Sequence, residues 1–178
     1  TGTDAREPLK ALPPVFDATG MRVEQLFATS KDGTKVPYFV VWPKDARTDG
    51  STPTLLYGYA SYGITEEPFF SISRLAWMDA GGVFAVANPR GSSVFGREWH
   101  DQGKQATKPN TWRDFIASAE NINYQKWTQP EQLGIWGGSA GGILLGLPIG
   151  AFYVLAGSVA LWLVTEFTPL GRALYVIG

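Results

Sequence analysis

Hydrophobic and polar residues alternate along the first part of the chain in a pattern typical of paired strands. Residues 21–30 (MRVEQLFATS) show the period of two that a half-buried strand requires. An Asp-Gly turn signal follows in KDGT, and residues 35–42 (KVPYFVVW) return as a second strand. The pattern predicts an antiparallel hairpin, preceded by an irregular lead-in over residues 1–20 that is rich in Pro, Asp and Thr.

Three further strands are predicted, all of them short and apolar. They cover residues 54–59 (TLLYGY), 83–88 (VFAVAN) and 133–137 (LGIWG), and each is a continuous apolar run of the kind that lies buried in a sheet. Helical segments separate them. A hairpin followed by alternating strands and helices predicts an α/β fold, with a mainly parallel sheet and helices packed outside it.

Two helices are predicted between these strands. Residues 71–82 (SISRLAWMDAGG) end in glycines, as helices commonly do. The second helix starts near Thr111, which fits a capping box with Asp114. Its predicted apolar face comprises Trp112, Phe115, Ala119 and Ile122. The segment between them, residues 89–110, is rich in Gly, Ser and Arg and is predicted to be a long loop.

Composition excludes several classes of function. The net charge of −1 gives no electrostatic reason to expect nucleic acid as a partner. The chain has no cysteine and a single histidine, His100, so we expect no disulfide, no metal site and no cofactor. A length of 178 residues suits one domain with a real core. The start at Thr1, with no basic and apolar leader, leads us to expect a piece of a longer protein without a visible secretory signal.

A serine stands among glycines directly after the last predicted strand. Gly137, Ser139 and Gly141 form the pattern G-x-S-x-G between that strand and an apolar, helix-like run, which is the context of a nucleophile elbow. Such a turn is so tight that only glycine fits two positions either side of the serine, whose oxygen is exposed above the sheet edge. The alternative is a glycine-rich helix start with an incidental serine. A phosphate-binding loop is excluded, because Ile143 stands where that loop requires lysine.

Four segments extend this pattern into a family resemblance: TLLYGYASYGI, SRLAWMDAGGVFAVANPRG, FGREWHDQG and GIWGGSAGG. In this order they resemble the prolyl oligopeptidase family of serine peptidases, over about residues 22–146. The resemblance implies an α/β-hydrolase catalytic domain that hydrolyses peptide bonds through an acyl-enzyme on Ser139. It further implies an oxyanion hole formed by the Ala140 amide and the Tyr59 hydroxyl, and it places Tyr62 near the substrate pocket.

Several residues keep alternative interpretations. Tyr59 could instead be a strand-end aromatic in the core with its hydroxyl on a backbone group. Arg90 could anchor substrate or form an ion pair in its loop, and we favour the ion pair. An esterase on the same fold is the other enzyme class, but YGYASYG and NPRGSSVFG resemble the peptidase family rather than lipases.

The groups that would activate the serine are missing from the sequence. In α/β-hydrolases the acid and the histidine follow the serine, but after Ser139 this chain has one carboxylate, Glu166, and no histidine. His100 and its neighbour Asp101 precede the serine, in the wrong chain order, and we expect them to pack in a loop. The chain by itself is therefore predicted to be essentially inactive.

The C-terminal tail differs from the rest of the chain. No residue from Gln132 to Thr165 is charged, a run longer than the ~20 residues that span a bilayer. We divide the chain into the lead-in 1–20, a partial catalytic domain 21–146 and a hydrophobic tail 147–178. We expect a join of two unrelated fragments near residue 146, with a transmembrane segment over 147–165. TPLGRALYVIG resembles the segment after a membrane span in sugar-type ABC transporter permeases, and a buried helix after the serine is the alternative. Localisation stays open between cytoplasm or periplasm for the parent peptidase and a membrane for a genuine span, as do residue preference and oligomeric state.

Overall fold

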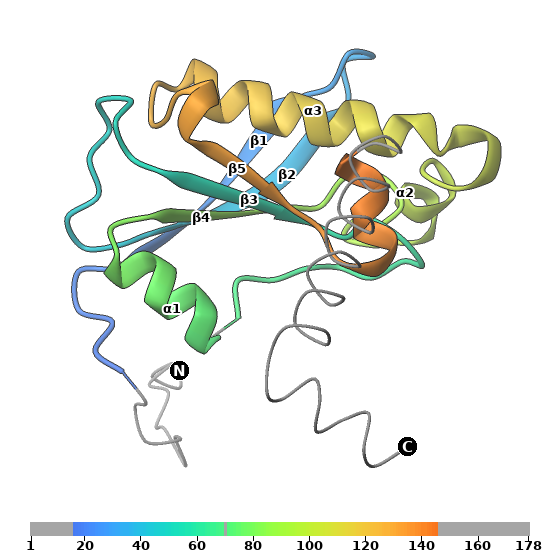
Figure 1. The fold of residues 1–178 in the computed structure, drawn as a ribbon. Helices are drawn as coiled ribbons and strands as arrows, with labels where there is room; N and C mark the ends of the chain where they lie inside the picture. Colours follow the sequence, from blue (N-terminus) through green and yellow to red (C-terminus); the bar gives the residue numbers. More distant parts are fainter. Residues whose placement is uncertain (1–15, 70, 146–178) are drawn as a thin grey trace, which may run out of the picture.

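A computed structural model of the chain describes residues 16–69 and 71–145, which form a sheet with helices on both faces (Figure 1). The elements, in chain order, are β1 (Arg22–Thr29), β2 (Lys35–Trp42), β3 (Thr54–Gly58), α1 (Ile72–Asp79), β4 (Val83–Ala87), α2 (Arg97–Asp101), the 3₁₀ turn η1 (Gln105–Thr107), α3 (Pro109–Tyr124), η2 (Pro130–Gln132), β5 (Leu133–Trp136) and η3 (Ser139–Leu145). The predicted α/β class is confirmed.

The sheet has the strand order β1-β2-β4-β3-β5. The predicted hairpin is present, with β1 and β2 antiparallel from Arg22 opposite Trp42 to Thr29 opposite Lys35. β2 also pairs antiparallel with β4, whereas β3 lies parallel to both β4 and β5. The described sheet is therefore mixed, with a parallel part built from the strands that alternate with helices.

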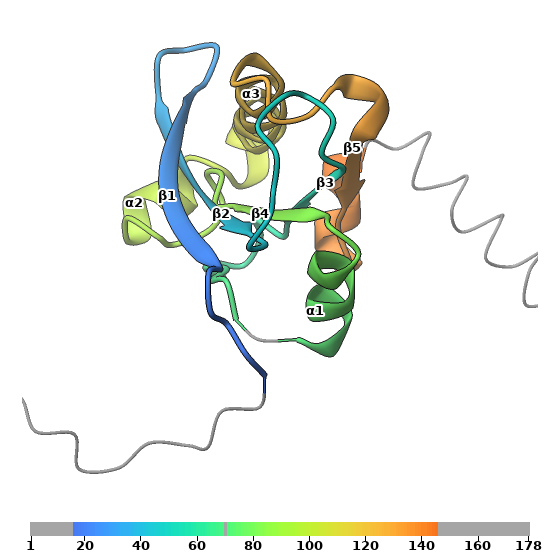
Figure 2. The same ribbon diagram turned by 90° about the vertical axis from the view of Figure 1, so that its left-hand side faces the viewer.

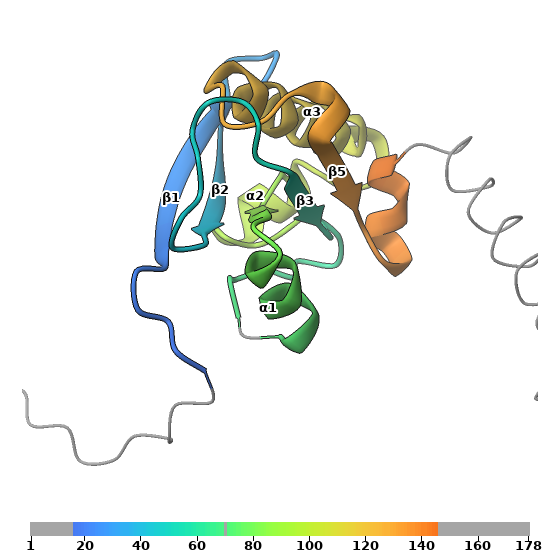
Figure 3. The same ribbon diagram turned by 60° about the vertical axis from the view of Figure 1, so that its left-hand side comes forward.

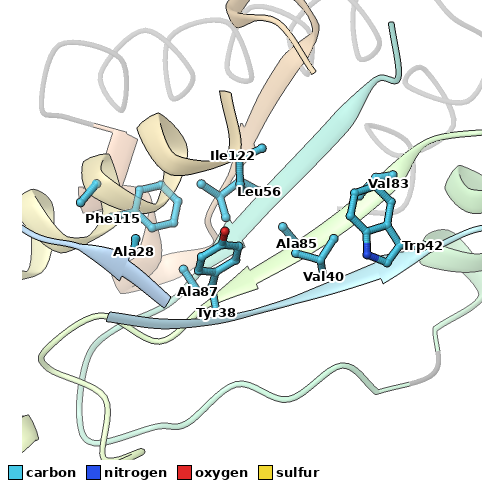
Figure 4. Close-up of a cluster of buried hydrophobic side chains, with 11 residues drawn as sticks. Ala28, Tyr38, Val40, Trp42, Leu56, Val83, Ala85, Ala87, Phe115 and Ile122 are labelled. Carbon is cyan, nitrogen blue, oxygen red and sulfur yellow. The ribbon is translucent and has the colours of Figure 1, made fainter. Parts of the chain in front are cut away.

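Helices α3 and α1 cover opposite faces of the sheet, as the view along it shows (Figure 2). The main core lies between the sheet and α3 (Figure 4). It takes alternate side chains from β2 and β4, since successive residues of a strand point to opposite faces. Its buried members are Ala28, Tyr38, Val40, Trp42, Leu56, Val83, Ala85, Ala87, Phe115, Ala117 and Ile122. Both faces of β4 are buried, as its continuous apolar run predicted.

Three expectations for the region before and within α3 are wrong. The helix begins at Pro109, so Thr111 and Asp114 lie inside it, both fully buried, and do not cap it. Trp112 is 37% exposed and does not share the buried face of Phe115 and Ile122. The predicted long loop 89–110 also contains α2 and η1.

The last strand, β5, is present as predicted but is not buried. Ile135 is 41% exposed and Trp136 is 45% exposed. Within the described part of the chain, β5 stands at the end of the strand order and pairs only with β3 (Figure 3). An apolar run thus formed a strand without the covering layers that would bury it.

Candidate functional site

Two of the predicted site residues leave the sheet at the same edge. β3 ends at Gly58 and β5 ends at Trp136, and the two strands are parallel neighbours with Tyr57 opposite Trp136. Tyr59 and Ser139 therefore follow adjacent strand ends, where ligands of α/β sheets commonly bind. Arg90 also follows a strand end at this edge, since β4 stops at Ala87 between β2 and β3.

The turn that carries Ser139 is crowded by backbone on the inside and open to solvent at the serine. A Cβ on Gly137 would lie 2.3 Å from the carbonyl oxygen of Gly141. A Cβ on Gly141 would lie 2.6 Å from the carbonyl oxygen of Gly58 and 3.1 Å from the Cα of Tyr59. Neither position has room for a side chain, so the turn packs directly against the end of β3.

Ser139 has a backbone conformation that few residues with a side chain adopt. Its φ is +52°, in the left-handed region, and the residue is exposed. It opens η3, the helical turn that runs to Leu145. Ala140 follows within the first turn of η3, where backbone amides have no partner inside the helix and remain available to an acceptor. A hydroxyl and an amide of the first helical turn thus stand side by side at the sheet edge.

The aromatic residues after β3 differ in exposure. Tyr59 is half-buried, and within residues 16–69 and 71–145 its hydroxyl has no hydrogen-bond partner, so the expected alternative of a backbone contact is not observed there. Tyr62 is 79% exposed and has a φ of +56°. Ala60 between them has a φ of +49°. Residues 60–62 therefore include two strained positions, which need outside contacts to persist.

Arg90 forms an ion pair, as expected, but a buried one. Its Nη2 lies 2.6 Å from Oδ1 of Asp114 and its Nε lies 2.8 Å from Oδ2 of the same carboxylate. Its Nη1 lies 2.7 Å from Oδ2 of Asp32, in the hairpin turn. The hydrogen bond from Arg90 holds the pKa of Asp32 well below its usual value. This network joins the hairpin, the loop after β4 and α3.

His100 lies in α2 and binds the loop that precedes this helix. The half-buried ring places Nδ1 2.8 Å from the carbonyl oxygen of Gly91, and because a carbonyl only accepts, Nδ1 carries the proton. Asp101 is bound by Lys104, with Nζ 2.5 Å from Oδ1. Both residues therefore lie in a helix rather than in the expected loop, and their side chains bind partners in the neighbouring segments. Among the described residues no group of three or more His, Cys, Asp or Glu side chains could hold a metal ion.

Sequence reasoning missed Lys108, which lies just before α3. Its Nζ donates to the carbonyl oxygen of Ala60 at 2.8 Å and contacts the Ser61 hydroxyl at 3.0 Å. No spacing motif singles out this residue, because its partners lie 47 and 48 positions away in the chain. It connects α3 to the loop that carries Tyr59 and Tyr62.

An α/β protein with an exposed serine in a glycine-bounded turn at the carboxyl edge of its strands belongs to a class in which hydrolases are common. The sequence profile of the prolyl oligopeptidase family matches residues 68–160, just over half of the chain. The chain belongs to the prolyl oligopeptidase family.

Individual relatives agree with this assignment. The prolyl endopeptidase of Elizabethkingia meningoseptica is 42% identical over 123 residues, which cover 69% of this chain and 17% of the relative. A solved prolyl endopeptidase is 52% identical, with a TM-score of 0.72 over 74% of this chain and 20% of that one. Prolyl oligopeptidase B from Galerina marginata, solved bound to a 35mer hydrolysis and macrocyclization substrate, is 39% identical with a TM-score of 0.70, covering 73% of this chain and 18% of that one. The chain spans about a fifth of the length of these relatives.

The predicted tail lies outside the described residues. The family profile runs to residue 160 and so enters this tail, whereas the resemblance to transporter permeases is not supported by the comparisons. Across residues 16–69 and 71–145, no helix has both the length and the apolar character needed to cross a membrane. The division at residue 146 stays a prediction.

Proposed function

We propose that this chain carries the nucleophile half of a serine peptidase active site on a partial α/β-hydrolase fold. Ser139 is the nucleophile that attacks the carbonyl carbon of a peptide bond. Its Oγ forms the acyl-enzyme ester while the amine leaves, and water then releases the acyl group. The observation that carries the proposal is the turn itself. An exposed serine with a positive φ lies between two glycines, and backbone atoms leave no room for a side chain at either glycine.

The negative charge that develops on the substrate oxygen needs donors held in place beforehand. The Ala140 amide and the Tyr59 hydroxyl fill that role in the proposal, since both follow neighbouring strand ends and neither is used inside the described part of the fold. Each such donor contributes about a hundredfold to a thousandfold in rate. Tyr62, exposed on the same loop, offers an aromatic surface to a substrate side chain.

Proton transfer is the missing function. A serine hydroxyl needs a base, and the only histidine of the chain is His100, whose Nδ1 is occupied by a backbone carbonyl. We therefore propose that the chain alone turns over peptide at a negligible rate, since loss of the base costs on the order of a millionfold. The substrate is a peptide, in line with the peptide-bound relative from Galerina marginata.

Free imidazole can stand in for the absent histidine, which gives a test on the chain as it is. The purified chain is incubated with an alkyl fluorophosphonate, and the modified residue is located by mass spectrometry. Attack by Oγ on phosphorus expels fluoride, and imidazole takes the serine proton. We expect slow labelling of Ser139 that accelerates in proportion to imidazole concentration.

Three variants make the test specific. Ser139→Ala abolishes the imidazole-dependent label, and Tyr59→Phe slows it by about a hundredfold through loss of an oxyanion donor. The control Tyr124→Phe changes an 81% exposed tyrosine at the end of α3 and leaves the rate unchanged. Rapid labelling without imidazole would contradict the proposal that the chain lacks a base. Imidazole-dependent labelling of Ser139→Ala would contradict the assignment of Ser139 as the nucleophile.

Two other candidates are separated by simple measurements. A simple esterase on the same fold would, with its base restored, cleave activated esters but not acyl-peptide amides. A membrane-attached product is favoured only by the uncharged run from Gln132 to Thr165. Alkaline extraction of membranes from expressing cells tests it: retention in the pellet supports a span, and release removes this candidate.

A further inference from the structure

We propose that Lys108 is a positioning residue that holds the loop of residues 60–63 in its strained conformation and thereby places the Tyr59 hydroxyl for oxyanion binding. This inference rests on the proposed function, and it assigns a role to a residue outside the serine turn. The Nζ of Lys108 donates to the Ala60 carbonyl oxygen and contacts the Ser61 hydroxyl.

The first argument is the unusual environment of the ammonium group. Lys108 is half-buried, and within the described part of the chain no carboxylate lies within ion-pair distance of its Nζ. Burial lowers the pKa of Lys108. An ammonium group that gives up water for a carbonyl and a hydroxyl gains little stability. The role of the Lys108 ammonium group is therefore better explained by the loop that it holds in place than by the energy of its hydrogen bonds.

The second argument is the strain in the segment that Lys108 holds. Ala60 and Tyr62 both have φ values near +50°, at +49° and +56°. Non-glycine residues in this region cost of order 1–3 kcal/mol each and persist only where surrounding contacts fix them. Lys108 binds the carbonyl of the first strained residue, directly after Tyr59. Release of this contact allows the loop to relax and the tyrosine to move.

The third argument is that Lys108 belongs to a stripe of polar residues along α3. Lys108, Thr111 and Asp114 are spaced by three, so they share one side of the helix start. The Thr111 hydroxyl donates to the carbonyl oxygen of Arg90 at 2.6 Å, and Asp114 binds the Arg90 side chain. The stripe therefore holds the loop after β4 as well as the loop after β3.

The two loops are also joined to each other. The Gly63 amide donates to the carbonyl oxygen of Gly91 at 3.1 Å, and the Ser93 hydroxyl donates to the carbonyl oxygen of Gly63. Gly91 has a φ of +106°, and a Cβ there would lie 2.5 Å from the carbonyl oxygen of Ala60. Lys108 thus binds the Ala60 carbonyl, which packs against Gly91, and the Gly63 amide binds the carbonyl of the same Gly91. Exchange of the Gly63 amide therefore measures how firmly the two loops are joined.

The test compares Lys108→Met with Lys104→Met in the full 178-residue chain. Methionine keeps the length of the side chain and removes the donors. Lys104 is the matched control, because it lies four residues earlier and pairs with Asp101 on the surface. We expect imidazole-dependent labelling of Ser139 to slow by about tenfold in Lys108→Met and to stay unchanged in Lys104→Met.

A double-mutant cycle with Tyr59→Phe separates positioning from a general loss of structure. If Lys108 acts through the Tyr59 hydroxyl, Lys108→Met slows labelling little further in the Tyr59→Phe background. A merely structural role would give the same tenfold loss in both backgrounds. Additive losses, or a Lys108→Met rate within twofold of wild type, overturn the proposal.

Amide exchange keeps the proposal testable without any labelling. In Lys108→Met the Gly63 amide is expected to exchange about fivefold faster, as the loss of one net hydrogen bond implies, while core amides of β4 keep their protection. Unchanged exchange at Gly63 overturns the proposal. If wild type itself is not labelled, the proposed function fails, and the exchange result still decides whether Lys108 holds the loop.

Discussion

Replacing Gly137 by alanine tests the packing that presents Ser139. The new Cβ would lie 2.3 Å from the Gly141 carbonyl oxygen and 2.7 Å from its carbonyl carbon, whereas ordinary contact begins at 3.4 Å. The turn must therefore open by about 1 Å, the difference between 3.4 and 2.3 Å. Because the obstacles are backbone atoms, no side-chain rotation can relieve the clash. We expect a loss of about 3 kcal/mol in the free energy of unfolding.

Gly138→Ala is the matched control in the same turn, since a Cβ at that position meets no atom within 4 Å among residues 16–69 and 71–145, its chain neighbours aside. We expect the midpoint of thermal unfolding, followed by circular dichroism, to fall by roughly 6–12 °C for Gly137→Ala and by less than about 2 °C for Gly138→Ala. Imidazole-dependent labelling of Ser139 should fall with the first substitution only. Equal effects of the two alanines on melting and labelling would refute the account of a turn crowded on one side.

Three further predictions concern stability. Asp114→Ala leaves the Arg90 guanidinium, 3% exposed, without its main partner and is expected to cost about 3–5 kcal/mol in urea unfolding; a loss below 1 kcal/mol contradicts it. Asp32→Asn costs about 1 kcal/mol or less, because the Asp32 side chain is 46% exposed. Because folding lowers the pKa of Asp32, its contribution to the free energy of unfolding is present above pH 4 and fades below it. An unaltered pH dependence of stability below pH 4 in Asp32→Asn would refute this. Burial raises the pKa of Tyr38 from 10.0 to about 12. The free energy of unfolding is therefore independent of Tyr38 ionisation below pH 10 and falls by about 2–3 kcal/mol as the pH rises to 12. Tyr38→Phe should flatten this decline.

The strands could be predicted from sequence because their signals are local. Alternation in residues 21–30, the Asp-Gly turn and the apolar run of β4 each determine a strand or a turn within ten residues or fewer. The exposure of β5 could not be predicted, since an apolar run indicates a strand but not which layers cover it. The elements were therefore accessible from the sequence, and their burial was only partly so.

The residues around α3 show a second limit. A spacing of three between Thr111 and Asp114 is shared by a capping box and by two positions on one helix face, and the sequence does not separate these readings. The structure chooses the second, because both side chains reach Arg90. Lys108 carries no local signal at all, since its role depends on contacts with a distant loop. Ser139 could be predicted as a candidate because the glycines that its turn requires lie within the same five residues.

A crystal structure of the chain soaked with a peptidyl boronic acid is the most direct test of the central claim. Boron accepts the serine oxygen and becomes a tetrahedral anion that resembles the intermediate of acyl transfer. The account predicts boron bonded to Oγ of Ser139, with one boronate oxygen within about 3 Å of both the Ala140 nitrogen and the Tyr59 hydroxyl. Boron bonded to another residue, or a Tyr59 hydroxyl turned away from an adduct on Ser139, would contradict it.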